Sequence, residues 1–140
     1  MQAPTTGLWP RPMTEHQAPL QVDVEARAVG DTQATFVTPA GELDLSNADE
    51  LAAILSSPPC SEAPGLVLDL RAVPFMDSSG FRVVMVAARD HEPRFAVLIA
   101  AESEVAKVIE LVDVAGRLPV AFDEDGALRM VATVGPRVDP

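Results

Sequence analysis

The alternation of short aliphatic runs with segments of helical spacing is the feature that most limits how this chain can fold. Two runs with alternating apolar and polar residues come first, at 20–28 and 33–38, with a turn at Gly30-Asp31 between them. Later runs predict buried strands at 65–70, 94–100 and 118–122. Helical segments are expected from a cap at Ser46 to Pro58-Pro59, and over 79–89, 102–112 and 123–134. The order β-β-α-β-α-β-α-β-α predicts an α/β fold whose small sheet is mixed, mainly parallel, and opens with an N-terminal hairpin.

Apolar spacing also predicts which face each helix buries. In the first helix, Ser46 is the expected N-cap, and Asp49 completes a weak capping box. Three residues of that helix share one face: Ala48, Leu51 and Leu55. In the helix over 79–89, four residues are expected to line the buried side: Phe81, Val84, Met85 and Ala88.

Length and composition favour one domain with an aliphatic core. The chain has 140 residues, of which 48% are apolar and only 4% aromatic. Residues 1–19 hold four prolines and no period, so we expect a disordered Pro-rich tail before a domain at 20–134 and a short C-terminal tail at 135–140. No apolar run reaches the roughly 20 residues of a membrane span, and the N-terminus lacks the regions of a signal peptide. We therefore expect a cytoplasmic protein that does not enter membranes.

The charge of the chain argues against nucleic-acid binding. The formal net charge is −11, and no basic stripe is present, so a phosphate backbone is a poor partner. Another protein or a small ligand fits better. The single cysteine, Cys60, lies in the loop-like stretch "SSPPCSEAPG", where its thiol could be exposed, and it predicts no specific redox role.

The stretch "PFMDSSGFRV", residues 74–83, interrupts the apolar pattern at a strand-to-helix junction. A hydroxyl at a helix N-terminus can cap the helix, or it can carry a phosphate near unpaired backbone N–H groups. Capping is the default interpretation of such a segment. Two features favour a working site instead: three candidate caps occur in a row, and a second junction, "GELDLS", places Glu42 and Asp44 in an analogous position.

Enzyme interpretations have little support. A serine nucleophile needs a base within hydrogen-bond reach, but His16 lies in the N-terminal tail and His91 at the far end of the helix, roughly 15–20 Å from Ser78. We expect no catalytic residues and no cofactor.

A metal-dependent phospho-acceptor site is also disfavoured. Asp44, Asp69 and Asp77 lie near strand ends, as carboxylates around a divalent metal would. However, such a site also needs a lysine, and the only one, Lys107, lies in the middle of a helix. Asp69 can equally be a hydrogen-bonded structural residue, so we expect no metal site.

Three segments resemble the STAS domain of bacterial anti-sigma factor antagonists. They are "GELDLSNADEL", "LVLDLRAVPFMDSSGFRVVM" and "LVDVAGRLPVAFDEDGAL", and the resemblance runs over about residues 20–134. The D-S-S-G block is its most specific part. The loop "RDHEPRF" departs from the pattern in lacking a glycine, and the Pro-rich tail lies outside it. The resemblance implies a small mixed sheet with about four helices on one side.

The resemblance also implies a partner-switching function. Members of that family bind, when unmodified, an anti-sigma factor that is usually a serine kinase of the histidine-kinase-like ATPase type, and this frees a sigma factor. The kinase phosphorylates the first serine of the D-S-S-G block, which matches Ser78, and a metal-dependent, PP2C-type serine phosphatase resets the switch. The implied partner-binding residues are Glu42, Asp44, Asp77, Ser78, Ser79 and Gly80, with Ser79 a helix cap rather than the phosphate acceptor.

Two alternatives remain open. A STAS domain can serve a stressosome-like scaffold or a transporter-associated assembly, although a stand-alone single domain argues mildly against both. A small-ligand or nucleotide-binding module is the other alternative, although the sequence has no Gly-rich phosphate loop.

Overall fold

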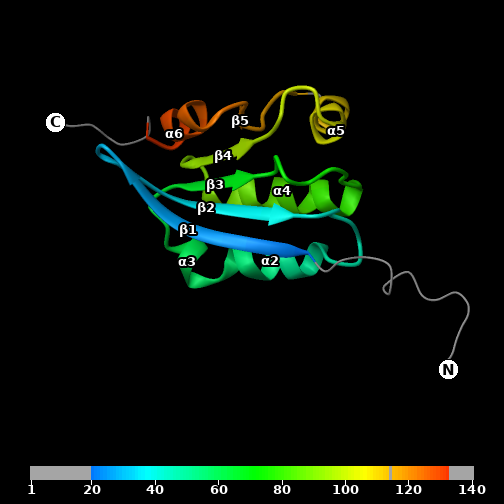
Figure 1. Ribbon diagram of the computed structural model, residues 1–140, viewed down its shortest axis with the longest axis horizontal. Coiled ribbons are helices and arrows are strands. Elements are labelled where there is room, and N and C mark those ends of the chain that lie inside the picture. The colour runs from blue at the N-terminus through cyan, green and yellow to red at the C-terminus, as the bar shows by residue number, and fades with distance from the viewer. Residues whose placement is uncertain (1–19, 114, 133–140) are drawn as a thin grey trace, which may run out of the picture.

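The computed structural model describes residues 20–113 and 115–132, which form a five-stranded sheet with helices on both faces (Figure 1). The strands lie in the order β1-β2-β3-β4-β5, with β1 and β2 antiparallel and each later pair parallel. The strands are β1 Gln21–Val29, β2 Thr32–Ala40, β3 Leu66–Asp69, β4 Phe95–Leu98 and β5 Val120–Ala121. The helices are α2 Ala48–Ser56, α3 Pro58–Ser61, α4 Ser78–His91, α5 Glu104–Val112 and α6 Glu124–Ala132. The predicted fold class is confirmed; the two predicted tails lie outside the described residues.

The N-terminal hairpin turns where the sequence predicts it. Gly30 adopts a φ of 61°, which a glycine reaches without steric cost, and Val29 pairs directly with Thr32 across the two-residue turn. From there the register continues to Gln21 opposite Ala40. Within the described residues β1 pairs with β2 alone, so it forms one edge of the sheet.

The helices divide between the two faces of the sheet. Buried side chains of α2, α3, α4 and α5 share one core cluster with Val37, Leu68 and Val97, so three of the four predicted helices lie on one face, together with the short α3 that was not predicted. The predicted C-terminal helix, α6, packs on the opposite face through Ala127 and Val131. The reason is topological: α2 to α5 belong to crossovers that all step in one direction, and right-handed crossovers put them on one face. Because α6 follows the last strand, no crossover constrains it.

A short helix and a shifted buried face are differences from the prediction. Pro58-Pro59 ends α2 as expected, but the same two prolines begin α3. Proline is tolerated there because the N–H groups of a first helical turn have no acceptor within the helix. In α4 the buried residues are Gly80, Val83, Val84 and Ala87, of which only Val84 was predicted. Met85 is exposed, and Phe81 is only partly buried. The helix therefore approaches the sheet through its smaller side chains.

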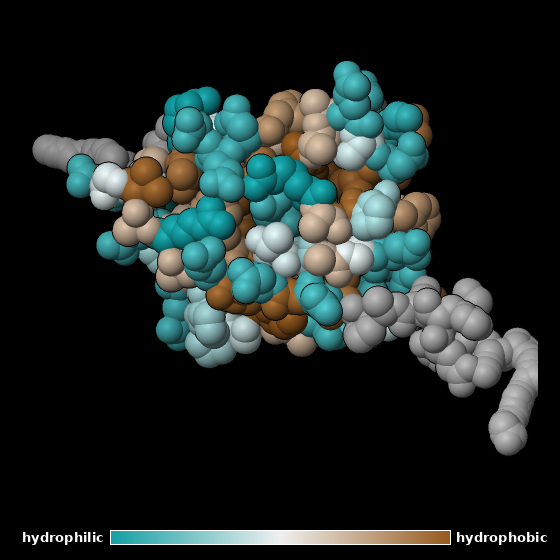
Figure 2. Space-filling view, in the orientation of Figure 1, coloured by the Kyte–Doolittle hydropathy of each residue, from teal (hydrophilic) through white to brown (hydrophobic). Residues whose placement is uncertain are grey.

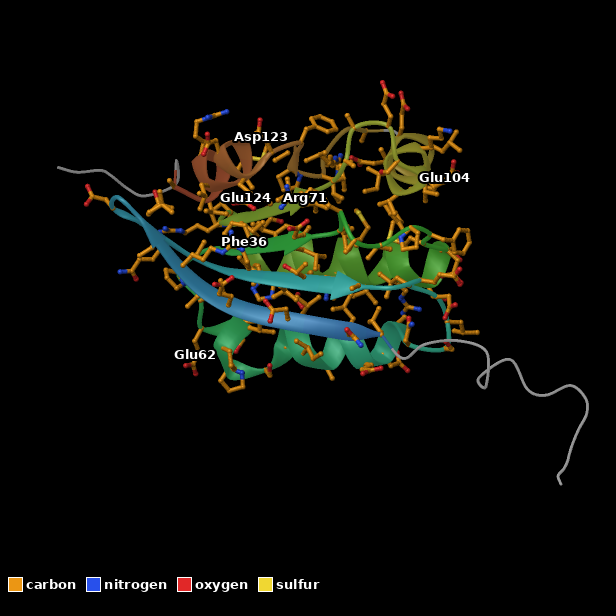
Figure 3. All side chains as sticks on the ribbon, in the orientation of Figure 1. Phe36, Glu62, Arg71, Glu104, Asp123 and Glu124 are labelled. Carbon is orange, nitrogen blue, oxygen red and sulfur yellow. The ribbon has the colours of Figure 1, made fainter. Side chains whose placement is uncertain are left out.

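An ion-pair network holds α6 against the sheet (Figure 3). Arg71 donates from Nε and Nη2 to the buried carboxylate of Asp69, at 3.0 and 2.9 Å, and this raises the pKa of the guanidinium further above its usual range. Arg71 also donates to Glu124 at the start of α6. Glu124 in turn accepts from Arg27, whose guanidinium lies 4.0 Å from the centre of the Phe36 ring. The carboxylate of Asp69 is thus structural, one of the two roles the sequence left open.

Cys60 is not exposed, contrary to expectation. It lies on α3 and is fully buried in the larger core cluster, because the helix turns a segment that looks like a loop against the apolar side of the sheet. Burial raises the pKa of the Cys60 thiol, since a thiolate would be poorly solvated there.

We predict that the Cys60 thiol reacts slowly in the folded chain. With Ellman's reagent at mildly alkaline pH, the reaction should be at least about tenfold slower than in denaturing guanidinium chloride, because both access and thiolate formation are restricted. A folded-state rate equal to the denatured rate would contradict the buried position.

Candidate functional site

Hydrogen bonds join the two strand-to-helix loops that the sequence singles out. The backbone N–H of Leu43 donates to the carbonyl of Phe75 at 2.9 Å, and the N–H of Asp77 donates to the carbonyl of Leu43 at 3.2 Å. Leu43 and Met76 form an isolated parallel bridge, and both side chains are buried. The acidic loop after β2 and the loop before α4 are therefore adjacent and held in fixed register.

Gly80 allows the helix to sit this close to the acidic loop. A Cβ atom at this position would lie 2.5 Å from Cγ of Met76 and 2.9 Å from Cγ of Leu43, inside van der Waals contact. Gly80 is one of the residues predicted for partner binding. It is buried and lies beneath the exposed residues of the site. A glycine is needed here for close approach rather than for its backbone angles.

Asp77 caps the helix that Ser78 begins. One carboxylate oxygen of Asp77 accepts hydrogen bonds from the N–H groups of Ser79 and Gly80, at 2.8 and 3.1 Å. The helix cap is therefore Asp77, the residue that precedes the helix, and not Ser79 as expected. With the cap supplied by Asp77, the exposed hydroxyl of Ser78 is not required for it.

The acidic loop is ordered by its own side chains. The Asp44 carboxylate accepts from the N–H and the hydroxyl of Ser46, at 2.9 and 2.6 Å. Asn47 accepts from the N–H of Asp44 and donates to the carbonyl of Glu42. The residue that precedes α2 is Asn47 and not the predicted Ser46, and the Asn47 side chain makes no capping hydrogen bond to the helix. Glu42 and Leu45 are left exposed on a rigid loop.

Two large apolar side chains border the serine pair, and neither was expected from the sequence. Leu45 is 79% exposed on the acidic loop, and Phe75 is 47% exposed just before α4. Both could have been noticed in the sequence, because Leu45 follows Asp44 and Phe75 precedes Met76 without fitting the apolar period of a helix or a strand. Exposed apolar groups next to polar ones are typical of protein-binding surfaces.

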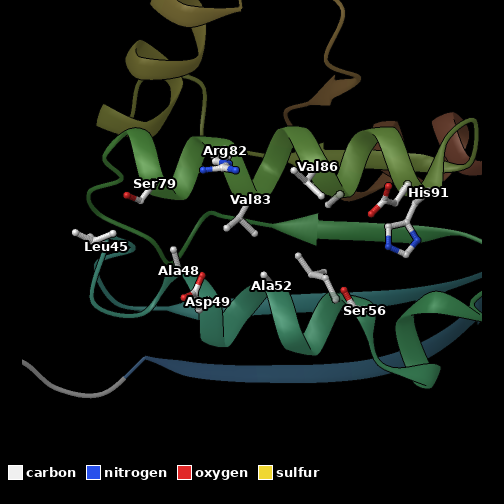
Figure 4. A pocket seen from close by; sticks show the side chains of 13 residues that line it. Leu45, Ala48, Asp49, Ala52, Ser56, Ser79, Arg82, Val83, Val86 and His91 are labelled. Carbon is white, nitrogen blue, oxygen red and sulfur yellow. The ribbon is translucent and has the colours of Figure 1, made fainter.

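A groove between α2 and α4 opens beside this site (Figure 4). Its volume is about 310 Å³, and small apolar residues such as Ala48 and Ala52 help to line it. Ser79 lies toward one end and His91 toward the other. Ser79 thus lies where the polar start of α4 meets this groove, whose lining also includes the charged residues Asp49, Arg82 and Asp90.

Other candidate residues lie apart from the site. His91 is the last residue of α4, so the whole helix, roughly 20 Å long, separates it from Ser78. Among residues 20–113 and 115–132, no group of three or more His, Cys, Asp or Glu side chains is arranged to hold a metal ion. Within the same ranges, no helix is both long and apolar enough to cross a bilayer.

Comparison with known proteins identifies the family. The model of the STAS domain matches residues 24–127, which is most of the chain. This chain belongs to the STAS domain family. No functionally curated protein matches the sequence.

Two solved structures show the same fold as this STAS domain. An anti-sigma factor antagonist from Mycobacterium paratuberculosis has a TM-score of 0.67 at 23% identity, covering 82% of this chain and 97% of its own. The unphosphorylated form of the anti-sigma factor antagonist SpoIIAA has a TM-score of 0.57 at 21% identity, covering 81% of this chain and 100% of its own. At these identities the likeness concerns the fold.

Substitutions of Asp77 in the STAS domain should separate its capping role from its charge. Asp77→Ala should lower the free energy of unfolding by about 1 kcal/mol, because two helix N–H groups lose their acceptor. Asp77→Asn should retain most of that stability, since an amide oxygen can accept the same bonds. Urea denaturation of both variants checks this, and equal losses would assign the stabilisation to the charge of Asp77.

Proposed function

We propose that this STAS domain is an anti-sigma factor antagonist whose binding is switched by phosphorylation of Ser78. In this proposal the unphosphorylated protein binds an anti-sigma factor that is also a serine kinase of the histidine-kinase-like ATPase type, and thereby frees a sigma factor. Phosphorylation of Ser78 releases the complex, and a PP2C-type serine phosphatase restores it. The antagonists of the same fold support this assignment. The protein acts by binding and is not itself an enzyme.

The observation that carries the proposal is the exposed Ser78 hydroxyl on the first turn of a capped helix. Since Asp77 supplies the cap, modification of Ser78 removes no hydrogen bond from the helix start. A phosphate adds about −1.5 to −2 charges and three acceptor oxygens at this position. The positive end of the helix favours that charge, whereas the neighbouring Asp77 carboxylate opposes it. The fold should therefore tolerate the phosphate.

A bound partner should not tolerate it. The surface around Ser78 combines the exposed apolar side chains of Leu45 and Phe75 with the acidic residues Glu42 and Asp44. We infer that a partner covers the apolar pair and places basic or polar groups opposite the acids. A phosphate in the middle of such an interface adds bulk and mismatched negative charge, which can cost several kcal/mol.

Phosphorylation by the cognate kinase tests the acceptor site. After incubation with the kinase and ATP, intact-mass analysis should find one added phosphate on the wild type and on Ser79→Ala, and none on Ser78→Ala. Phosphate on Ser78→Ala would refute Ser78 as the acceptor.

Affinity capture from the native organism tests the partner class. The dephosphorylated protein should retain an anti-sigma factor, and the phosphorylated protein should not. Capture of a transporter or of a large multi-STAS assembly instead would favour the scaffold alternative.

A further inference from the structure

The outer strand β1 has a hydrogen-bonding edge that no other strand of the described residues covers. Within the described residues it pairs with β2 alone and is the outermost strand of the sheet (Figure 1). Natural edge strands are usually shielded by proline, by charged side chains (lysine above all), by a bulge or by short length. The three charged residues of β1 do not repel a second copy in every register, as shown below. β1 is nine residues long, pairs with β2 in continuous register, and its sequence "QVDVEARAV" has neither proline nor lysine.

The direction of the free backbone groups follows from the neighbouring strand. The N–H of Thr35 donates to the carbonyl of Gly65, on the β3 side of β2, and Thr35 lies opposite Ala26. The pair of Ala26 and Thr35 is therefore not hydrogen-bonded, so the N–H and C=O of Ala26 point away from β2. Hydrogen-bonded and non-hydrogen-bonded pairs alternate along an antiparallel pair of strands. The backbone N–H and C=O groups that point outward are therefore those of every second residue: Val22, Val24, Ala26 and Ala28.

The side chains of these four residues make the edge apolar. As every second residue of β1, these four point to the same face of the sheet. Val22 packs against the core, and the other three remain exposed. Figure 2 shows hydrophobic surface between the positions of β1 and α2. The charged residues of β1 lie on the opposite face: Asp23, Glu25 and Arg27.

We propose that β1 pairs with β1 of a second copy, antiparallel and across a two-fold axis at Ala26, so that the two sheets become continuous. In this register Glu25 of each copy lies opposite Arg27 of the other. Val24 pairs with Ala28, and Ala26 pairs with its own symmetry mate. The three outward pairs, with two hydrogen bonds each, give about six backbone hydrogen bonds.

Charge selects this register over its neighbours. An axis at Glu25 would place the two Glu25 side chains opposite each other, and an axis at Arg27 would do the same with two arginines. An axis at Val24 would place Asp23 opposite Glu25, which brings two carboxylates together on each side of the axis. Like charges directly opposite are destabilising and opposite charges stabilising, so the axis at Ala26 is the favourable one of these four.

A second copy fits this edge better than the N-terminal segment of the same chain does. Residues 1–19 hold four prolines, each of which lacks the N–H that an added strand must donate. The sequence of β1, in contrast, complements itself in both charge and length.

The pairing would leave both proposed switch sites open. Gln21, at the start of β1, pairs with Ala40, which directly precedes the acidic loop, so each copy carries its site beyond the N-terminal end of its own β1. An antiparallel pair puts these two ends at opposite ends of the joined sheet. Dimerisation and partner binding are therefore independent of each other. An experiment that excludes the dimer would leave the proposed function unaffected.

Sedimentation of the full chain tests the pairing. The wild type should pass from monomer to dimer between about 5 and about 500 µM, because dimerisation follows mass action. A wild-type chain that remains monomeric throughout this range would overturn the proposal.

Charge variants test the register. Glu25→Arg and Arg27→Glu should each weaken self-association by about tenfold or more, because each puts like charges opposite one another. An equimolar mixture should associate again, since each variant then supplies the opposite charge that the other lacks. Glu110→Arg, on α5, makes the same charge change away from β1 and should behave as the wild type. Because Arg27 also pairs with Glu124 on α6, circular dichroism has to show that Arg27→Glu keeps the fold. With both variants folded, no recovery in the mixture would rule out this register. If Arg27→Glu does not fold, Glu25→Arg tests the register alone, and association as strong as that of the wild type would rule it out.

A backbone variant tests the edge itself. Ala26→Pro removes an outward N–H without removing a bond to β2, so it should abolish the dimer while circular dichroism shows the fold retained. If a folded Ala26→Pro protein dimerises as the wild type does, the proposal is wrong. If Ala26→Pro does not fold, the charge variants decide alone.

Discussion

Ser78→Glu is expected to weaken binding to the anti-sigma partner by about tenfold or more, whereas Ser78→Ala should bind as the wild type does. The glutamate side chain brings negative charge and bulk to the exposed first turn of α4, near the exposed side chains of Leu45 and Phe75. Alanine removes the hydroxyl that accepts phosphate, but it adds neither negative charge nor bulk. Isothermal titration with the purified partner measures both affinities.

The folded state has to be compared in the same variants. Both should unfold within about 1 kcal/mol of the wild type, because Asp77 and not Ser78 caps the helix. A loss of binding without a loss of stability would locate the effect at the interface. Equal affinities for Ser78→Ala and Ser78→Glu would contradict the proposed switch.

Gly80→Val should destabilise the domain by about 1–3 kcal/mol through overpacking. Even a single Cβ would lie 2.5 Å from Met76 and 2.9 Å from Leu43, and the two extra methyl groups of valine need more space in the same buried contact. Leu43 and Met76 lie on the two loops that hydrogen bonds join, so a shift of either side chain strains the contact between these loops. Denaturant unfolding gives the change in stability, and partner titration shows whether the site is displaced.

A matched glycine provides the control. Gly126 is the third residue of α6, as Gly80 is of α4, and its N–H also donates to a preceding aspartate, Asp123, at 2.7 Å. A Cβ on Gly126 would come no closer than 3.1 Å, to the side-chain oxygen of Asp123. Gly126→Ala should therefore be nearly neutral, and Gly80→Ala should be the less stable of the two. Equal effects would mean that the contact with Leu43 is not limiting.

The strand order and the site loops could be predicted because each has a local signature. Aliphatic runs such as 65–70 are too short for helices, and crossover handedness then limits the topology. The site loops stand out because polar residues interrupt apolar runs at two junctions. Parallel strands bring such junctions to one edge of the sheet, so their proximity in space follows from the topology.

The remaining features depend on tertiary contacts that no local pattern records. In α4, Val83 and Ala87 were not expected to be buried, because the missing side chain of Gly80 lets this face of the helix approach Leu43 and Met76 of the two loops. Cys60 is buried because a short helix folds back onto the core. The position of α6 depends on the packing of Ala127 and Val131 against the sheet and on an ion pair of Glu124 with Arg71, 53 residues earlier in the chain.

The contact between the two loops has a consequence for engineering orthogonal switches from this scaffold. Leu43, Met76 and Gly80 face inward and hold the loops together, while Glu42 and Leu45 face outward. Recoding the outward positions should change which partner is recognised, and leaving the inward three untouched should preserve the geometry on which recognition depends. Libraries that randomise both sets at once would mostly sample broken scaffolds rather than new specificities.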